Sequence, residues 1–478
     1  MVTISKWLST IAIATAGLAP PLLASSAVAQ QPTQQPAQQA GSQSSLPTLA
    51  VEETTLPNGL RLILHVDSTT PTVTVNLWYH VGSKDEPDRR NGFAHLFEHL
   101  MFQGSKNVGE DRFFQYLEEA GASDINGTTS LDRTNYYATV PSNQLELALW
   151  LESDRMGFLL DHVNQDTFET QRRVVLNERR QNYVDAPYGM VRRFIQERMF
   201  PVGHPYHRTT IGSPEDLGAA AIGDVHTFYK TFYVPNNATL VIAGDIDVAE
   251  TRRLVEKYFG PVPRGRQPTV FTAPVPAPVS GEQVLDVEAA VELGRVYVVY
   301  PTPPFFAPGD AELDGLSQIL SNGMSSRLYK RLVYDLQIAK DVTAYQASNQ
   351  LASFFQIVAT AKPGVAPSDL LRAIDDELGR LRGAPPTVAE TQRAKAILES
   401  SLIFRIEQVG ERANMFNTYA QMLGTPDYFT RDIERYRALT PESLQQAAKT
   451  YLPQSNRVVV FVQPNPDAPR SGRVKGGK

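Results

Sequence analysis

The sequence predicts an α+β protein of two homologous α/β-roll domains, each with an antiparallel-rich sheet packed against helices. The chain has 478 residues, which is too long for one compact core. Six prolines between residues 261 and 281 mark a stiff boundary near its middle. Tyr233–Pro235 and Tyr451–Pro453 share the pattern Tyr-x-Pro between a predicted helix and a predicted strand, as two copies of one unit would.

The first 29 residues have the features of a secretory signal. Lys6 supplies a positive charge, residues 7–24 are mostly apolar, and Ala27-Val28-Ala29 is a signal-peptidase pattern. An anchor left in place is the alternative, but the apolar stretch is short and contains two prolines. We predict cleavage after Ala29, a periplasmic or secreted protein, and no stable membrane span in the mature chain. Residues 30–48, rich in Gln and Pro, are predicted to be a disordered linker.

The rest of the chain alternates between strand and helix patterns. Alternating apolar residues predict strands at 60–65, 72–79 and 238–246, and helical spacing predicts helices at 92–102, 111–120, 145–160, 166–183 and 248–258. The second half opens with a strand at 295–300, continues with helices from residue 310 and closes with a strand at 457–462. The predicted segments are an N-terminal domain at 49–262, a Pro-rich linker at 263–283, a C-terminal domain at 284–466 and a flexible tail at 467–478.

Composition excludes some functions. The net charge of −6 leaves no broad basic field, so nucleic acid is not an expected partner. The chain has no cysteine, so core burial without disulfides must hold it together. Any metal site must therefore use His, Asp or Glu.

The segment His95-Leu96-Phe97-Glu98-His99 carries the chemistry. Side chains four residues apart lie on one face of a helix, so His95 and His99 direct two imidazoles at one point, which suits a tetrahedral Zn²⁺. Glu98 lies near that face and can take the proton of a metal-bound water without being a ligand. The chain has only eight histidines, so a chance match to this pattern is rare.

A zinc peptidase needs a third protein ligand and an open fourth position. Glu178, in the predicted helix 166–183, is the best candidate. Spacing alone leaves it open, because Arg179 and Arg180 beside it also fit a solvated helix face.

Longer stretches resemble the inverzincin peptidases, the family of pitrilysin, insulin-degrading enzyme and mitochondrial processing peptidase. The matching stretches are 82–86, 92–104, 126–130, 134–137, 151–156, 173–180, 204–206 and, in the second half, 323–329. The resemblance implies zinc bound by His95, His99 and Glu178, with Glu98 as general base. It also implies that Asn126, Gly127, Thr128 and Thr129 form an edge strand that binds extended substrate, although an ordinary Gly/Thr turn is the alternative there.

The sequence departs from the family pattern in two places. Gln171 replaces a second-shell glutamate that members often have seven residues before the ligand glutamate; it can hydrogen-bond but brings no charge. Val333 and Lys340 occupy the positions of an Arg and a Tyr with which self-sufficient members bind substrate and stabilise the oxyanion. The chain therefore resembles the zinc subunit of members that divide these roles between two chains.

These observations predict a zinc metalloendopeptidase that cleaves short or unfolded polypeptides. The N-terminal domain would be catalytic and the C-terminal domain non-catalytic. The expected partner is a homologous chain that carries the Arg/Tyr pair, as a heterodimer, although a homodimer is possible. The alternative is a catalytically silent assembly or binding subunit of the same family, against which the intact ligand set argues. A metal-dependent hydrolase of non-peptide substrates has only the metal motif in its favour.

Overall fold

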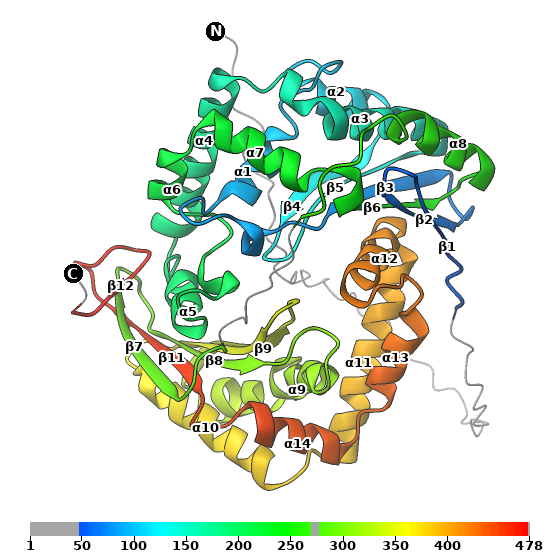
Figure 1. Cartoon of the computed structure of the whole chain (residues 1–478). Coiled ribbons are helices and arrows are strands. Elements are labelled where there is room, and N and C mark those ends of the chain that lie inside the picture. The colour runs from blue at the N-terminus through cyan, green and yellow to red at the C-terminus, as the bar shows by residue number, and fades with distance from the viewer. Residues whose placement is uncertain (1–46, 269–276, 477–478) are drawn as a thin grey trace, which may run out of the picture. The chain divides into compact units, whose positions relative to one another are not determined.

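The computed structural model describes residues 47–268 and 277–476, and from Thr48 onward they belong to one compact unit (Figure 1). The predicted signal sequence and all but the end of the predicted linker 30–48 lie outside the described residues, as do residues 269–276 of the Pro-rich segment. Within the described ranges, no helix is long and apolar enough to cross a bilayer.

The first half is built on a six-stranded sheet in the order β1-β2-β6-β3-β5-β4. Neighbouring strands are antiparallel except for β2 and β6, which run parallel. β4 is an edge strand, so one side of its backbone is free of sheet hydrogen bonds. The strands are β1 (Glu52–Thr55), β2 (Arg61–Val66), β3 (Thr72–Tyr79), β4 (Ser123–Thr129), β5 (Thr134–Pro141) and β6 (Ala238–Gly244).

Helices with apolar faces pack on one side of this sheet and enclose the first core. Phe93, Leu96 and Phe97 of α1 are almost completely buried in it, with Leu149 of α3 and Val255 of α8. The helices of this half are α1 (Phe93–Leu100), α2 (Arg112–Glu119), α3 (Leu145–Phe158), α4 (Gln165–Arg179), α5 (Val191–Met199), α6 (Pro214–Ala219), α7 (Ile222–Phe232) and α8 (Val248–Phe259).

The second half repeats this architecture. Its sheet has the order β12-β7-β11-β8-β10-β9, again with one parallel pair, β7 and β11. The predicted α+β class with two similar halves is therefore confirmed. The expected tail contributes the short strand β12, which pairs with β7. The strands are β7 (Glu282–Ala289), β8 (Arg295–Thr302), β9 (Ala339–Ala347), β10 (Ser353–Ala361), β11 (Arg457–Pro464) and β12 (Arg473–Val474).

The helices of the second half follow the same succession. α9 begins after Gly309 (φ 98°) as α1 begins after Gly92 (φ 101°), and both glycines are left-handed N-caps. Because glycine accepts positive φ without strain, the chain enters both helices through the same left-handed turn. The helices are α9 (Asp310–Ser321), α10 (Pro367–Gly383), α11 (Val388–Glu407), α12 (Val409–Leu423), α13 (Phe429–Arg437) and α14 (Pro441–Tyr451).

One helix of each half packs on the sheet of the other half (Figure 1). α5 of the first half packs on β8 and β11, where Val191, Ile195 and Met199 join a core with Val458 and Val460. α12 of the second half packs on β3 and β6 of the first sheet. The two sheets are therefore covered on their second faces by exchanged helices, which ties the halves together.

Three predicted helix starts, those of α1, α2 and α4, were wrong by one residue, and the N-cap explains the last of them. The sequence predicts a helix from Asp166, but α4 begins at Gln165 and its N-cap is Asn164. The Asn164 Oδ1 accepts the backbone N–H groups of Asp166 (2.9 Å) and Thr167 (3.1 Å), so it satisfies two free donors of the first turn. α4 continues into a π-helical turn, η4 (Arg180–Val184).

Candidate metal centre

α1 is fixed by its apolar face and by a carboxyl group at its N-terminus. With Phe93, Leu96, Phe97 and Leu100 in the core, the remaining side chains His95, Glu98 and His99 turn toward α4 and β4. The sequence pattern therefore orients the motif before any metal contact is considered.

Glu86 anchors the first turn of α1. Its Oε2 accepts the N–H of Gly92 (3.0 Å) and the Asn91 side-chain amide (2.9 Å), and its Oε1 accepts the N–H of Ala94 (2.9 Å). Burial raises the pKa of the Glu86 carboxyl to about 8, against these three hydrogen bonds, which favour the ionised form. These contacts fix the backbone of α1 up to Ala94, the residue before His95.

Glu178 approaches the two imidazoles from α4. Phe168 and Val175 are fully buried on that helix, which turns Glu178 toward α1 one turn after Val175. The His95 and His99 Nε2 atoms lie 3.4 Å apart, and the Glu178 Oε2 lies 3.6 Å from the first and 3.4 Å from the second. The structure thus brings together the three residues that the sequence singled out as ligands.

These spacings fit a tetrahedral cation. Ligand atoms about 2.0–2.1 Å from a four-coordinate Zn²⁺ must be roughly 3.3–3.4 Å from each other. Among the described residues, this trio is the group of metal-ligating side chains whose ligand atoms all lie within 4.8 Å of one another. The buried Oε2 of Glu178 and Nδ1 of His95 have no hydrogen-bond partner in the described part of the chain, so the carboxylate oxygen is placed to coordinate. A His₂Glu set suits zinc.

The electrostatics keep both kinds of ligand in the form that binds metal. Burial lowers the pKa of His95, with Glu98 and Glu178 opposing, so the imidazole is neutral at physiological pH. Burial would raise the pKa of Glu178, but the nearby imidazoles of His99 and His95 lower it further than burial raises it. The carboxyl is therefore ionised.

The side chain of Glu98 extends from α1 toward β4 and is 6% exposed. Its Oε2 accepts the hydroxyl of Thr129 at 2.6 Å. The glycine at position 127 makes room for it, because a Cβ there would lie 3.2 Å from the Glu98 Cγ and 3.0 Å from a ring carbon of Phe102. The side chain therefore sits beside the edge strand and next to the ligand trio.

The hydrogen-bond register shows which backbone groups of β4 are free. Ser130 N donates to Arg133 O (2.8 Å), and bonded pairs alternate along an antiparallel ladder, so Asn126 and Thr128 bond to β5. Gly127 and Thr129 then point their backbone groups to the open edge, where the Asn126 Oδ1 accepts the Gly127 N–H at 2.8 Å. All four residues predicted to bind substrate lie on this edge strand.

The two departures from the family pattern are placed as follows. Gln171 is buried on α4, two turns before Glu178. Val333 is half-buried in a π-helical turn, η7 (Tyr329–Asp335), and Lys340 is the exposed second residue of β9. Val333 and Lys340 belong to the second half of the chain, whereas α1 and α4 belong to the first.

Two family models match successive parts of the chain. The model described as "Insulinase (Peptidase family M16)" matches residues 61–211, which include the ligand trio and Glu98, and the model "Peptidase M16 inactive domain" matches residues 221–398. The chain belongs to peptidase family M16.

Individual M16 relatives cover most of the chain. The zinc protease PqqE of Helicobacter pylori is 29% identical over 88% of this chain and 94% of that protein. The crystal structure of a protease from Helicobacter pylori, 27% identical, superposes with a TM-score of 0.79 over 87% of this chain and all of that one. The periplasmic protease PqqL from Escherichia coli, at 20% identity and a TM-score of 0.72, shares the fold over 88% of this chain but only 48% of its own.

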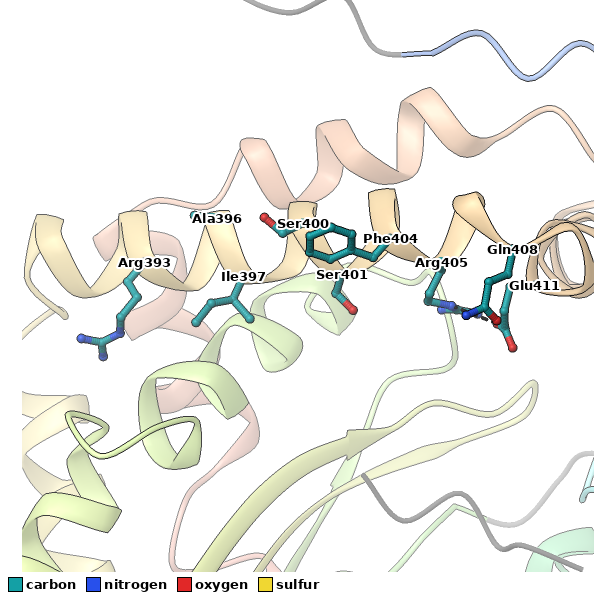
Figure 2. A pocket seen from close by; sticks show the side chains of 9 residues that line it. All are labelled: Arg393, Ala396, Ile397, Ser400, Ser401, Phe404, Arg405, Gln408 and Glu411. Atoms are coloured by element: carbon teal, nitrogen blue, oxygen red, sulfur yellow. Dashed lines mark hydrogen bonds and ion pairs between the residues drawn. The ribbon is translucent and has the colours of Figure 1, made fainter. Parts of the chain in front are cut away.

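Sequence reasoning missed a groove of about 830 Å³ along α11, the counterpart of α4 in the second half (Figure 2). Phe404, 64% exposed, lies in it, and Arg405 is paired with Glu411 (3.3 Å) at one end. None of the metal-centre residues lines it. The sequence carried no signal for this groove, because the exposure of Phe404 is visible only in the structure.

Proposed function

We propose that this M16 protein is a zinc-dependent metalloendopeptidase that hydrolyses peptide bonds of short or unfolded polypeptides outside the cytoplasm. The convergence of His95, His99 and Glu178 at tetrahedral spacing, beside Glu98 and an open edge strand, carries the proposal. Relatives named as zinc proteases support it.

The chain's own residues supply binding, orientation and proton transfer. Zn²⁺ bound by the trio supplies Lewis acidity to a peptide carbonyl and to water. Glu98 takes the proton of the attacking water and gives it to the leaving amine. The Thr129 hydroxyl, which donates to the Glu98 Oε2 at 2.6 Å, holds the carboxylate in one orientation for both transfers.

An extended peptide would add to β4 as a further strand. The outward carbonyl of Gly127 and the outward backbone groups of Thr129 supply hydrogen bonds that do not depend on substrate sequence, and the Gly127 N–H joins them when it leaves the Asn126 Oδ1. Because only an extended chain can pair in this way, folded proteins would be poor substrates. Short or unfolded polypeptides are therefore the expected class.

The proposal includes a second, homologous chain. Valine at 333 cannot hydrogen-bond substrate or an oxyanion through its side chain, and Lys340 replaces the expected tyrosine. This chain spans about half the length of PqqL, whose single chain could hold two such units. We propose a heterodimer in which the partner supplies the Arg/Tyr pair; a homodimer is the alternative.

The first experiment compares Glu98→Gln with the parent protein on a quenched unfolded peptide. We expect cleavage to fall by roughly 10²–10⁴ while zinc stays bound, since the ligands are unchanged. Glu312→Gln, the same change on α9 of the second half, is the matched control and should cleave like the parent. Equal cleavage by Glu98→Gln and the parent would contradict the proposed role of Glu98.

The same assay separates the peptidase from a silent subunit. If the parent binds zinc but is inactive alone, it is assayed again with a homologous chain that carries the Arg/Tyr pair. Restored cleavage that depends on Glu98 would support the divided site. If neither the chain alone nor the mixture of the two chains cleaves peptide, the silent subunit is favoured. The description of the second family model as an inactive domain agrees with that alternative.

A further inference from the structure

The tip of the β4–β5 hairpin is buried, although hairpin tips usually face solvent. Leu131 and Asp132 form the turn, and Asp132 is only 3% exposed. A buried carboxylate at such a position needs partners, and it has several.

Two of the hydrogen-bond partners of Asp132 come from the second half. Its Oδ2 accepts the backbone N–H of Gln350 (2.9 Å), and its carbonyl oxygen accepts the side-chain amide of Gln421 on α12 (3.0 Å). Its Oδ1 accepts the hydroxyl of Tyr206 (2.5 Å), which itself accepts the N–H of Leu351 (2.9 Å). The carboxylate and the Tyr206 hydroxyl together bind two successive amides of one loop.

That loop is the tip of the β9–β10 hairpin, the counterpart of β4–β5 in the second sheet. The loop is anchored in its own half, because the Ser348 hydroxyl donates to the Oδ1 of the fully buried Asp310 (2.6 Å). Arg435 in turn donates to the Oδ2 of Asp310 (2.9 Å). The two hairpins thus meet tip to tip, and the second tip is fixed to a buried ion pair.

We propose that Asp132 and Tyr206 are positioning residues through which the second half holds β4 in register with the metal centre. The proposal rests on the peptidase function proposed above. Thr129, three residues before Asp132, donates to the Glu98 carboxylate, so a movement of the tip moves both the general base and the substrate edge. The opposite end of β4 is irregular, with a register shift between Ser123 and Asn126, so the tip is its firmer anchor.

The test uses Tyr206→Phe, which removes one hydroxyl and keeps the ring in the core. Tyr188→Phe is the matched control, because the Tyr188 hydroxyl also joins the halves, through the carbonyl of Leu293 (2.8 Å), and this hydrogen bond involves no residue of the hairpin. Asp132→Asn is the second variant and removes the charge from the same contact.

Two readouts are measured in the Glu98→Gln background, zinc content being checked in each protein. We expect Tyr206→Phe to weaken binding of a fluorescent unfolded peptide about tenfold and to speed hydrogen exchange of residues 123–133 by a similar factor, because a hydrogen bond to a buried carboxylate is lost. Zinc content should be unchanged. Tyr188→Phe should alter neither peptide binding nor exchange in this segment.

With Glu98 intact, KM for a long peptide should rise more than kcat falls. Exchange in residues 123–133 that is equal in Tyr206→Phe, Asp132→Asn and the parent would overturn the proposal, as would the same effect from Tyr188→Phe. If the parent neither binds nor cleaves peptide, the proposed function fails on its own account, and the exchange measurement still decides whether Asp132 and Tyr206 hold β4.

Discussion

The two halves share a strand order and a capping glycine but place different side chains at equivalent points. Three, six and seven residues after Gly92, α1 carries His95, Glu98 and His99. At the same distances after Gly309, α9 carries Glu312, Gly315 and Leu316. Among the described residues, one backbone thus supports a ligand set in the first half and no such set in the second. Apolar packing maintains the fold while a few side chains determine the chemistry.

The second half builds a buried ion-pair network around the same helix. Asp310, fully buried at the start of α9, is paired with Arg435, which also pairs with Asp432. Tyr436 donates to Asp314 (2.8 Å), and burial together with the charge of Asp310 raises the pKa of Asp314 to about 7. The polar groups near α9 therefore pair with one another. Beside α1, in contrast, the Glu178 Oε2 and the two imidazoles converge on a point that a cation can occupy.

The largest effect is expected from breaking the second-half network. Arg435→Met should destabilise the protein by about 3–5 kcal/mol, because Asp310 and Asp432 would remain buried without their cation. Denaturant unfolding monitored by circular dichroism measures the change. Arg437→Met, on the same helix but in an exposed pair with Glu399, is the control and should change stability by less than about 1 kcal/mol. An equal loss of unfolding free energy in the two variants would mean that the buried network stabilises the second half no more than an exposed ion pair does.

The next effect tests whether only the first half binds metal. His95→Ala should weaken zinc binding by more than about 100-fold, since losing only an outer partner of a ligand costs 10–100-fold. Glu312→Ala, at the equivalent point of α9, should leave zinc affinity unchanged. Competition with a chelator of known affinity measures both. A comparable loss in Glu312→Ala would show that the halves do not differ in the way described.

The smallest effect concerns the space beside Glu98. Gly127→Ala should cost about 1–2 kcal/mol of stability, because the new methyl would meet Phe102, Tyr136 and Glu98 at 3.0–3.2 Å. The displaced carboxylate should also lower kcat. Gly379→Ala, inside α10 of the second half, meets its nearest neighbour only at 4.0 Å and should stabilise by about 0.5–1 kcal/mol. Thermal unfolding and peptide cleavage are the measurements; an unchanged kcat in Gly127→Ala would remove the steric link between β4 and Glu98.

Much of the fold was predictable from local pattern. The strand predicted at 72–79 is β3 residue for residue, and the helix predicted at 248–258 is α8 within one residue. These elements have strong apolar periods and clear turn residues on either side. The start of α4 was misplaced because Asn164 and Asp166 are both good caps, and only the backbone path decides between them.

The sequence by itself determined the pairing of His95 with His99 and the place of Glu98, because these follow from the geometry of a single helix turn. It determined the repeat as well, through the proline boundary and the Tyr-x-Pro pair. Only the tertiary structure brought Glu178 to within 3.6 Å of both imidazoles, set β4 at a sheet edge and exchanged α5 and α12 between the halves. It alone joined Asp132 to Tyr206 and the β9–β10 tip. Such contacts join segments up to hundreds of residues apart, and the packing of whole sheets and helices, which no local period encodes, decides where they meet.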